Sequence, residues 1–390
     1  MSEMSRRSFV SLATLATLAS AAVPLVGWSR LAAADTAAPP VREKVLINYN
    51  ENPLGPSPKA VAAMQRGAAL SGRYHFEYQE QLIELFARQH GLPKDHVHAF
   101  CGSSEPLQYA VMAFTGPRSL VLANPSYEAA MVAAKAKGAP VHEVPLDASH
   151  AHDIPAMLAA DSQAGLIYIC NPNNPTGTVT ARERIEFAIA NRPKGSVVMI
   201  DEAYIHLSNE KSCLDLAAQH DDVLVLQTFS KLYGMAGARL GFAVGKPDLL
   251  AKLEVFGGEN AIPVAAMLGG MASLEDRQLV AQRRKENAAT RDETLAWLRQ
   301  RGFACTASQG NCFMVDTGRP GQQVIAALAR RNIVIGRTWP AWPTWVRVSV
   351  GLPNEMKAFR EAFVAVFKDP TALAGFTPLE RQGGQLAQLA

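Results

Sequence analysis

The sequence predicts an α/β fold with two domains. A large domain is expected to contain a mostly parallel sheet covered by helices, and a smaller α/β domain is expected to follow it. Short apolar runs alternate with amphipathic segments through most of the chain, and this alternation is typical of a parallel sheet wrapped in helices. From about residue 286 the elements become fewer and more mixed, which indicates the second, smaller unit.

The predicted strands of the large domain are short, continuous apolar runs. Runs without polar alternation are typical of strands that are buried on both faces, as in a sheet with helices on each side. The runs are VHAF at 97–100, SLVLA at 119–123, LIYIC at 166–170, SVVMI at 196–200, DVLVLQ at 222–227 and GFAVG at 241–245.

The segments between these strands carry apolar residues at helical spacing. In the large domain the helical patterns are EPLQYAVMAF at 105–114, YEAAMVAAKAK at 127–137 and ARERIEFAIANR at 181–192. In the smaller domain a charged helical pattern at 286–302 leads into shorter elements. These are NCFMVDT, QQVIAALARRN, IVIGRT, VRVSVG and EMKAFREAFVAVF.

These patterns divide the chain into five segments. We expect an export signal at 1–34, an N-terminal arm at 35–60, the large domain at 61–285, the small domain at 286–370 and a loose C-terminal tail at 371–390. The arm contains the Pro- and Gly-rich stretch NYNENPLGPSP, which is too broken for a helix or a central strand and predicts an ordered loop.

The first 34 residues predict a twin-arginine export signal. Arg6 and Arg7 are followed by Phe9, a weakly apolar stretch and small residues that end at Ala34. We therefore expect the twin-arginine export machinery to carry the folded chain to the periplasm, with cleavage near Ala34. An uncleaved membrane anchor is the alternative, because the apolar stretch at 9–28 is nearly long enough to span a bilayer.

Composition narrows the classes of partner. The 390 residues carry a formal net charge of +3, which is too small to indicate nucleic acid or an anionic membrane surface. Five cysteines, whose spacings match no zinc pattern, predict free and mostly buried thiols. The segment SHAHD, with His150 and His152, could hold a metal, but a solvated loop is favoured and no metal site is predicted.

Three polar clusters directly follow three of the predicted strands. LIYIC runs into NPNNPTG, SVVMI into DEAY, and DVLVLQTF into Ser230 and Lys231. In an open α/β sheet, ligands bind outside the carboxyl ends of the strands. The three clusters therefore predict a single pocket.

The residue types in this pocket point to pyridoxal 5′-phosphate. The amine of Lys231 can bond covalently to an aldehyde. Asp201, at the end of a buried strand, needs a cation such as a protonated pyridine nitrogen to stay ionised. Asn174 and Tyr204 can donate hydrogen bonds to a phenolate oxygen. Groups suited to a phosphate come from the glycine turn CGSSE ahead of a helical pattern and from Thr228, Ser230 and Arg239.

These residues resemble the fold type I pyridoxal-phosphate aminotransferases of class I and II, and most closely the histidinol-phosphate aminotransferase branch. The resemblance covers roughly residues 45–365, where the family's motifs occur in order. It implies the fold type I architecture and a transaminase (EC 2.6.1) that moves an amino group between an amino acid, or a related primary amine, and a 2-oxo acid. The motifs are NENPLGPSP, GSSEPLQ, NPSYEAA, NPNNPTGT, DEAY, SKLYGMAGARLGF and RVSVGLPNE.

The resemblance also implies roles for single residues. Lys231 is the catalytic residue, which holds the cofactor and acts as the general base. Asp201 pairs with the ring nitrogen, Tyr127 stacks on the ring, and Tyr74 reaches the phosphate from the neighbouring subunit, which implies a homodimer with shared sites. The other implied cofactor-binding residues are Gly102, Ser103, Ser104, Asn174, Tyr204, Thr228, Ser230 and Arg239. The implied substrate-binding residues are Arg347, which grips the substrate carboxylate, Arg337 and Asn52.

The substrate stays open, because the chain departs from that branch in two places. It has Tyr-His-Phe at 74–76 where the branch carries a YPD-type segment. It also has GRTWPAWPTWVRVSVG around Arg337, with Trp339, Trp342 and Trp345. The tryptophans either pack the small domain or form an aromatic wall that favours an apolar, aromatic or cationic side chain over a phosphate ester.

Three functions from different classes are compatible with these features. An aminotransferase is the first, and histidinol-phosphate transamination proper is one form of it. A related amino-acid decarboxylase or lyase is the second. A non-catalytic ligand sensor on the same fold is the third, and it ranks last because no helix-turn-helix precedes the domain and the first residues predict export.

Overall fold

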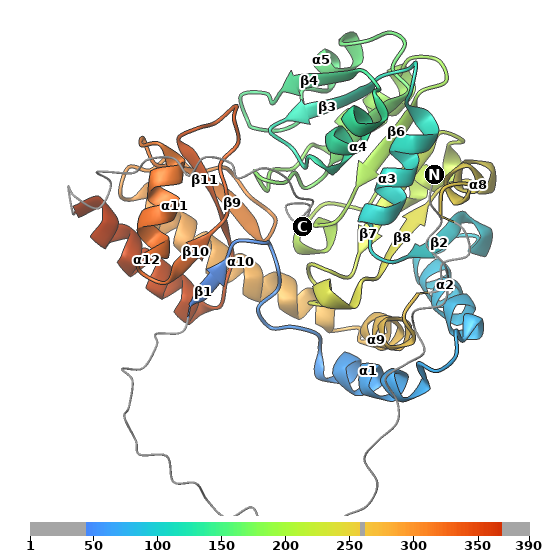
Figure 1. Ribbon diagram of the computed structural model, residues 1–390, viewed down its shortest axis with the longest axis horizontal. Helices are drawn as coiled ribbons and strands as arrows, with labels where there is room; N and C mark the ends of the chain where they lie inside the picture. The colour runs from blue at the N-terminus through green and yellow to red at the C-terminus, as the bar shows by residue number, and fades with distance from the viewer. Residues whose placement is uncertain (1–43, 258–261, 369–390) are drawn as a thin grey trace, which may run out of the picture. The chain divides into compact units, whose positions relative to one another are not determined.

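The computed structural model describes residues 44–257 and 262–368 (Figure 1). The predicted export signal at 1–34, the first part of the predicted arm and the predicted tail at 371–390 lie outside the described residues. None of the described helices has the length and hydropathy needed to cross a membrane.

The large sheet has seven strands in the order β2-β8-β7-β6-β5-β3-β4. Strand β8 runs antiparallel to both of its neighbours, and the remaining pairs are parallel. The predicted mostly parallel sheet is therefore confirmed, with one strand reversed. The strands are β2 (Val97–Phe100), β3 (Leu120–Asn124), β4 (Val141–Pro145), β5 (Leu166–Cys170), β6 (Val197–Asp201), β7 (Val223–Thr228) and β8 (Gly241–Val244).

Helices connect and cover these strands, and local sequence fixes several of their ends. Helix α1 begins after Ser57, whose hydroxyl accepts the N–H of Ala60, and Pro58 stands at its first position. Helix α4 ends at Gly138, which adopts the left-handed conformation that glycine tolerates best. The helices are α1 (Pro58–Leu70), α2 (Phe76–His90), α3 (Ser104–Phe114), α4 (Ala129–Lys137), α5 (Ile154–Ala159), α6 (Arg182–Asn191), α7 (Leu214–Gln219), α8 (Pro247–Glu254) and α9 (Val264–Glu275), with 3-10 turns η1 (Lys94–His96), η2 (Ile205–Leu207) and η3 (Ala236–Ala238).

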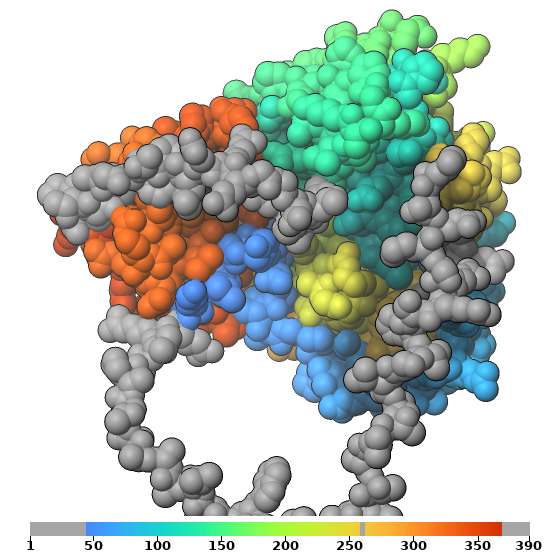
Figure 2. Space-filling model, viewed as in Figure 1, coloured from blue at the N-terminus to red at the C-terminus, as the bar shows by residue number. Residues whose placement is uncertain are grey.

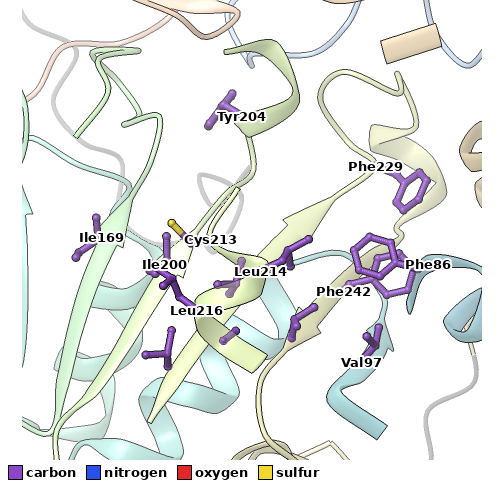
Figure 3. Packing of buried hydrophobic residues seen from close by; sticks show 14 of the residues in the cluster. Phe86, Val97, Ile169, Ile200, Tyr204, Cys213, Leu214, Leu216, Phe229 and Phe242 are labelled. Carbon is purple, nitrogen blue, oxygen red and sulfur yellow. The ribbon is translucent and has the colours of Figure 1, made fainter. Parts of the chain in front are cut away.

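Alternate residues of each central strand enter cores on opposite faces of the sheet. On β5, Ile167 and Ile169 belong to one core, whereas Leu166 and Tyr168 belong to the other. This two-sided burial is why the strands appear in the sequence as unbroken apolar runs. Figure 3 shows part of the first core, where Phe86 stacks on Phe242 with ring centroids 4.1 Å apart.

The C-terminal elements form a smaller unit with its own apolar core. Strands β9 and β11 pair antiparallel, and β10 pairs in parallel with β1, which comes from the predicted arm. The apolar, partly β-branched run Val45–Ile47 explains why this part of the arm is a strand rather than a loop. The elements are β1 (Val45–Ile47), α10 (Leu279–Arg299), β9 (Cys312–Asp316), α11 (Gly321–Ala329), β10 (Ile333–Ile335), β11 (Trp345–Ser349) and α12 (Pro353–Lys368).

The arm after β1 contacts both sets of elements. The N–H of Asn50 donates to Ser349 Oγ at 2.8 Å, and Asn52 Nδ2 donates to the Leu232 carbonyl at 2.8 Å. In Figure 2 part of the blue N-terminal segment lies between the orange C-terminal elements and the yellow segment. A Cβ on Gly234 would lie 2.0 Å from the Gly55 carbonyl oxygen, so the close approach of the arm requires glycine there.

The cysteines and the SHAHD histidines have structural surroundings. All five cysteines are free and three of them are buried, as expected. His152 is buried and its Nδ1 lies 3.0 Å from Thr180 Oγ1, so the expected solvated loop is wrong for this residue. His150 is half-buried against Trp342 and Trp345. The described residues hold no group of three or more His, Cys, Asp or Glu side chains that could bind a metal ion.

Candidate active site

A cavity of about 490 Å³ lies where β5, β6 and β7 end, at the carboxyl edge of the sheet. This volume is in the range of sites that hold a small molecule. The three polar clusters meet here, as the strand order requires, because β5, β6 and β7 are parallel neighbours. The predicted residues that line it are Ser103, Ser104, Tyr127, Asn174, Asp201, Tyr204, Thr228, Ser230, Lys231, Arg239 and Arg347.

Asp201 is the last residue of β6 and is only 2% exposed. The Tyr168 hydroxyl donates to its Oδ2 at 2.8 Å, and the Ala203 N–H donates to its Oδ1 at 3.1 Å. Burial raises the pKa of Asp201, while these hydrogen bonds and the charge of Lys231 oppose the rise. Among the described residues no cation forms an ion pair with this buried carboxylate, which is therefore suited to a positively charged ligand group.

Lys231 lies in the loop between β7 and β8 and borders the cavity. Its Nζ lies 3.4 Å from the Tyr49 carbonyl oxygen and 5.6 Å from the centre of the Tyr204 ring. Burial around the ammonium group, followed by the charge of Arg347, lowers its pKa to about 8. A lysine with a pKa near 8 supplies far more neutral, nucleophilic amine at neutral pH than an ordinary lysine does.

The lowered pKa gives an expected labelling profile for the cofactor-free chain. Reductive methylation requires the neutral amine, so its rate at Lys231 should fall about tenfold per pH unit below pH 8 and level off above it. In the urea-unfolded chain the same peptide should follow the ordinary lysine value of 10.5. Mass spectrometry of the Lys231 peptide measures both profiles, and coincident profiles would contradict the lowered pKa.

Asn174 and Tyr204 are held so that each presents a donor. Asn174 Oδ1 accepts from Arg347 Nη1 at 2.9 Å, which leaves its Nδ2 as the donor for a ligand. Tyr204 accepts from Asn50 Nδ2 at 3.1 Å, which leaves its O–H free to donate. Asn50 is itself fixed, because its Oδ1 accepts from the Ser349 hydroxyl at 2.8 Å. Two donors side by side suit an anionic oxygen on a ring.

One end of the cavity is built to bind an anion. Helix α3 begins at Ser104 directly beside it, and helix N-termini attract negative charge. Arg239 Nη1 lies 3.4 Å from Ser230 Oγ, and the Thr228 hydroxyl donates to the same oxygen at 2.9 Å. Gly102 does not line the cavity, but a Cβ there would lie 2.4 Å from Arg239 Nη2, so glycine is needed for the guanidinium to sit at this end.

Arg347 is a nearly buried cation, 6% exposed, with no carboxylate partner among the described residues. It donates to Asn174 and, through Nη2, to the Asn48 carbonyl at 2.5 Å. Its Nε is buried without a partner. Burial lowers the pKa of this guanidinium, so an anionic ligand would relieve the cost of burying it.

Besides Gly102, three predicted site residues do not line this cavity. Tyr74 is 70% exposed, and Arg337 forms an ion pair with Glu128 at 2.7 Å. Asn52 instead borders a separate cavity of about 400 Å³, which shares Lys231 with the first. Trp339 is buried, and no tryptophan among the described residues lines the first cavity, which agrees with the packing alternative for this loop.

Sequence reasoning missed Asn50 and Tyr168. Asn50 has φ of 56°, the left-handed conformation that asparagine adopts more readily than other side-chain residues, and it lies in the broken stretch NYNENP. That stretch predicts an irregular turn, although it does not indicate which residues Asn50 contacts. Tyr168 looks like any core residue of LIYIC, and only its place opposite β6 brings its hydroxyl to Asp201.

Comparisons with known proteins show the family of this chain. The chain matches the family described as aminotransferase class I and II over residues 42–363. It is 34% identical to a histidinol-phosphate aminotransferase of Symbiobacterium thermophilum, with 83% of this chain and 91% of that one covered. It is 30% identical to an aromatic amino acid aminotransferase of Cutibacterium acnes, with 83% and 93% covered.

A solved structure shows the same fold. A histidinol-phosphate aminotransferase of Sinorhizobium meliloti in complex with pyridoxal-5′-phosphate superimposes with a TM-score of 0.76 at 23% identity, covering 83% of this chain and 90% of that one. The family match spans well over half of the sequence. The chain therefore belongs to the class I and II aminotransferase family and is an enzyme that transfers amino groups.

Proposed function

We propose that this aminotransferase holds pyridoxal 5′-phosphate in the cavity at the carboxyl edge of the sheet. The observation that carries the proposal is Lys231, an amine with a pKa of about 8 that faces a buried carboxylate and an anion-binding end across one cavity. The structural neighbour from Sinorhizobium meliloti, which is in complex with this cofactor, supports the choice.

The groups around the cavity fit the cofactor. The end formed by α3, Ser230 and Arg239 would take the phosphate, and Asp201 would take the cationic ring nitrogen. The free donors of Asn174 and Tyr204 would take the phenolate oxygen. Each charged part of the cofactor thus has a counterpart among the residues that line the cavity.

When bound, pyridoxal phosphate supplies an aldehyde that condenses with amines and a ring that accepts electron density from the substrate. Lys231 Nζ is the base that takes the proton from the substrate α-carbon. Asp201 would hold the protonated ring nitrogen of the bound cofactor, and Arg347 would bind the substrate carboxylate as a fork. The buried Arg347 thereby orients the α-carbon toward Lys231.

The proposed substrates are an amino acid or related primary amine as donor and a 2-oxo acid as acceptor. Histidinol-phosphate transamination is the second candidate, and the name of the Symbiobacterium relative favours it. The Cutibacterium relative, an aromatic amino acid aminotransferase, favours an aromatic donor. A panel of donors against pyruvate, 2-oxoglutarate and oxaloacetate decides between them, with carbon dioxide release as the sign of a decarboxylase.

Cofactor loading is tested by spectroscopy. The purified chain with added pyridoxal phosphate should turn yellow and show the absorbance band of a lysine-bound cofactor. Borohydride should then fix the cofactor on the Lys231 peptide. A colourless protein without a fixed adduct would refute the proposal.

We further propose a homodimer in which Tyr74 completes the partner's site. Tyr74 and the neighbouring Phe76 are exposed large side chains in the single chain, and the resemblance gives Tyr74 a phosphate-binding role across the dimer. A Tyr74→Phe chain should bind the cofactor weakly, and a Lys231→Ala chain should be inactive. Mixing the two should restore activity, because one hybrid site has both residues intact. Failure to restore it in a demonstrated hybrid would contradict a shared site.

We also propose that the chain is exported by the twin-arginine machinery, since Arg6 and Arg7 precede a weakly apolar stretch. Replacing both with lysine should retain the enzyme in the cytosol with its first residues intact. Cell fractionation with N-terminal sequencing measures this. Unchanged export of the double variant would contradict the proposal.

A further inference from the structure

An ion pair lies beside the cavity and involves no residue of its lining. Arg337 Nη2 is 2.7 Å from Glu128 Oε2, and both side chains are partly exposed. Glu128 directly follows Tyr127, which lines the cavity. Arg337 is joined to Arg347 by the backbone, because the Arg347 N–H donates to the Arg337 carbonyl at 3.1 Å.

The two arginines also share one aromatic ring. The Arg337 guanidinium carbon lies 4.1 Å from the centre of the Trp339 indole, and that of Arg347 lies 5.6 Å from it. The two guanidinium groups are therefore no farther apart than the sum of these distances. Trp339 is 1% exposed and cannot move aside easily, so it holds both cations in place.

The two cations differ in one respect. Arg347 has no carboxylate partner among the residues that the structure describes, whereas Arg337 already has Glu128. A substrate with one carboxylate can use Arg347 without disturbing Arg337. A substrate with a second carboxylate on its side chain has to compete with Glu128 for the second guanidinium.

We propose that Glu128 is a specificity-determining residue, which occupies Arg337 and so favours substrates with an uncharged side chain over those with a second carboxylate. The inference rests on the proposed function, because it places the substrate carboxylate on Arg347. A transaminase binds donor and acceptor in turn in one site, so the same competition acts on dicarboxylic donors and on dicarboxylic oxo acids.

Equilibrium binding tests the competition without turnover. Glutarate carries two carboxylates and 3-phenylpropanoate carries one, and neither can donate an amino group. In calorimetry on the cofactor-loaded enzyme, Glu128→Gln should strengthen glutarate binding by about three- to fivefold, because a partly exposed ion pair is lost. Binding of 3-phenylpropanoate should change less than about twofold.

Three further variants distinguish a direct contact between Glu128 and Arg337 from a general effect of losing a negative charge. Glu143→Gln removes a carboxylate that pairs with Lys135 instead of Arg337, and it should leave the ratio of the two affinities unchanged. In an Arg337→Met background, Glu128→Gln should lose its effect, as a double-mutant cycle requires for a direct contact. Glu128→Ala removes the same charge and should give the same result. It replaces Glu128→Gln if that variant folds poorly.

Kinetics give the second readout. With pyruvate as acceptor, the ratio of kcat/KM for glutamate over phenylalanine should rise about three- to fivefold in Glu128→Gln. A ratio within twofold of the wild type, or an equal change in the Arg337→Met background, would overturn the proposal. If no donor is turned over by the wild type, the proposed function fails instead, while the two acids still report on Glu128 by calorimetry.

Discussion

Replacing Lys231 with alanine is expected to lower the rate of amino transfer by about 10⁴-fold or more, because the side chain serves both as the covalent anchor and as the base. No other described lysine borders this cavity. The absorbance band of the lysine-bound cofactor should disappear with the activity. Steady-state kinetics and a visible spectrum of the same preparation measure both losses.

An exposed lysine is the matched control for this substitution. Lys59 is largely exposed and pairs with Asp276 at the surface. Lys59→Ala should keep both the band and the rate, since an exposed ion pair contributes at most about 1 kcal/mol. A Lys231→Ala enzyme that folds normally and transaminates at the wild-type rate would contradict the assignment of the base.

Much of the large sheet could be predicted because its strands are buried on both faces. The six predicted runs correspond to β2, β3, β5, β6, β7 and β8, and among them VHAF of β2 is interrupted by His98. The opposite edge strand β2 was predicted, so edge position alone does not explain why β4, which pairs only with β3, was missed. Its sequence VHEVP carries His142 and Glu143, so it lacks the apolar run that marks a central strand.

The site was predictable where polar residues follow strands, and less so where contacts cross the chain. Asp201 and Lys231 stand at the carboxyl edge because β6 and β7 are parallel neighbours. By contrast, Asn50 meets Ser349 across 299 positions and Arg337 meets Glu128 across 209. No local pattern encodes such partners, since they arise only when separate elements fold together. The sequence therefore predicted many of the residues of the site, but it did not predict which residues they contact.

Replacing Asp201 with asparagine is expected to reduce kcat/KM by about 10²- to 10³-fold. The variant keeps the shape of the side chain and an oxygen that can accept from Tyr168, but it removes the negative charge. Taking one partner from a buried ion pair costs about 3–5 kcal/mol, which corresponds to this range of rates. Cofactor affinity should fall as well, and titration of the cofactor-free variant measures that loss separately from the rate.

Glu202 is the control that the chain itself supplies, because it is the next residue and is equally buried. Its oxygens accept from the Ser212 hydroxyl at 2.5 Å, the Cys213 N–H at 2.6 Å and Gln227 Nε2 at 2.8 Å, so protein groups satisfy it entirely away from the cavity. Glu202→Gln should therefore lower the free energy of unfolding by about 1–3 kcal/mol and leave kcat/KM per folded enzyme nearly unchanged. Equal losses of kcat/KM per folded enzyme in the two variants would contradict a specific contact of Asp201 with a ligand. A loss confined to Asp201→Asn would show that its charge acts on a ligand in the cavity.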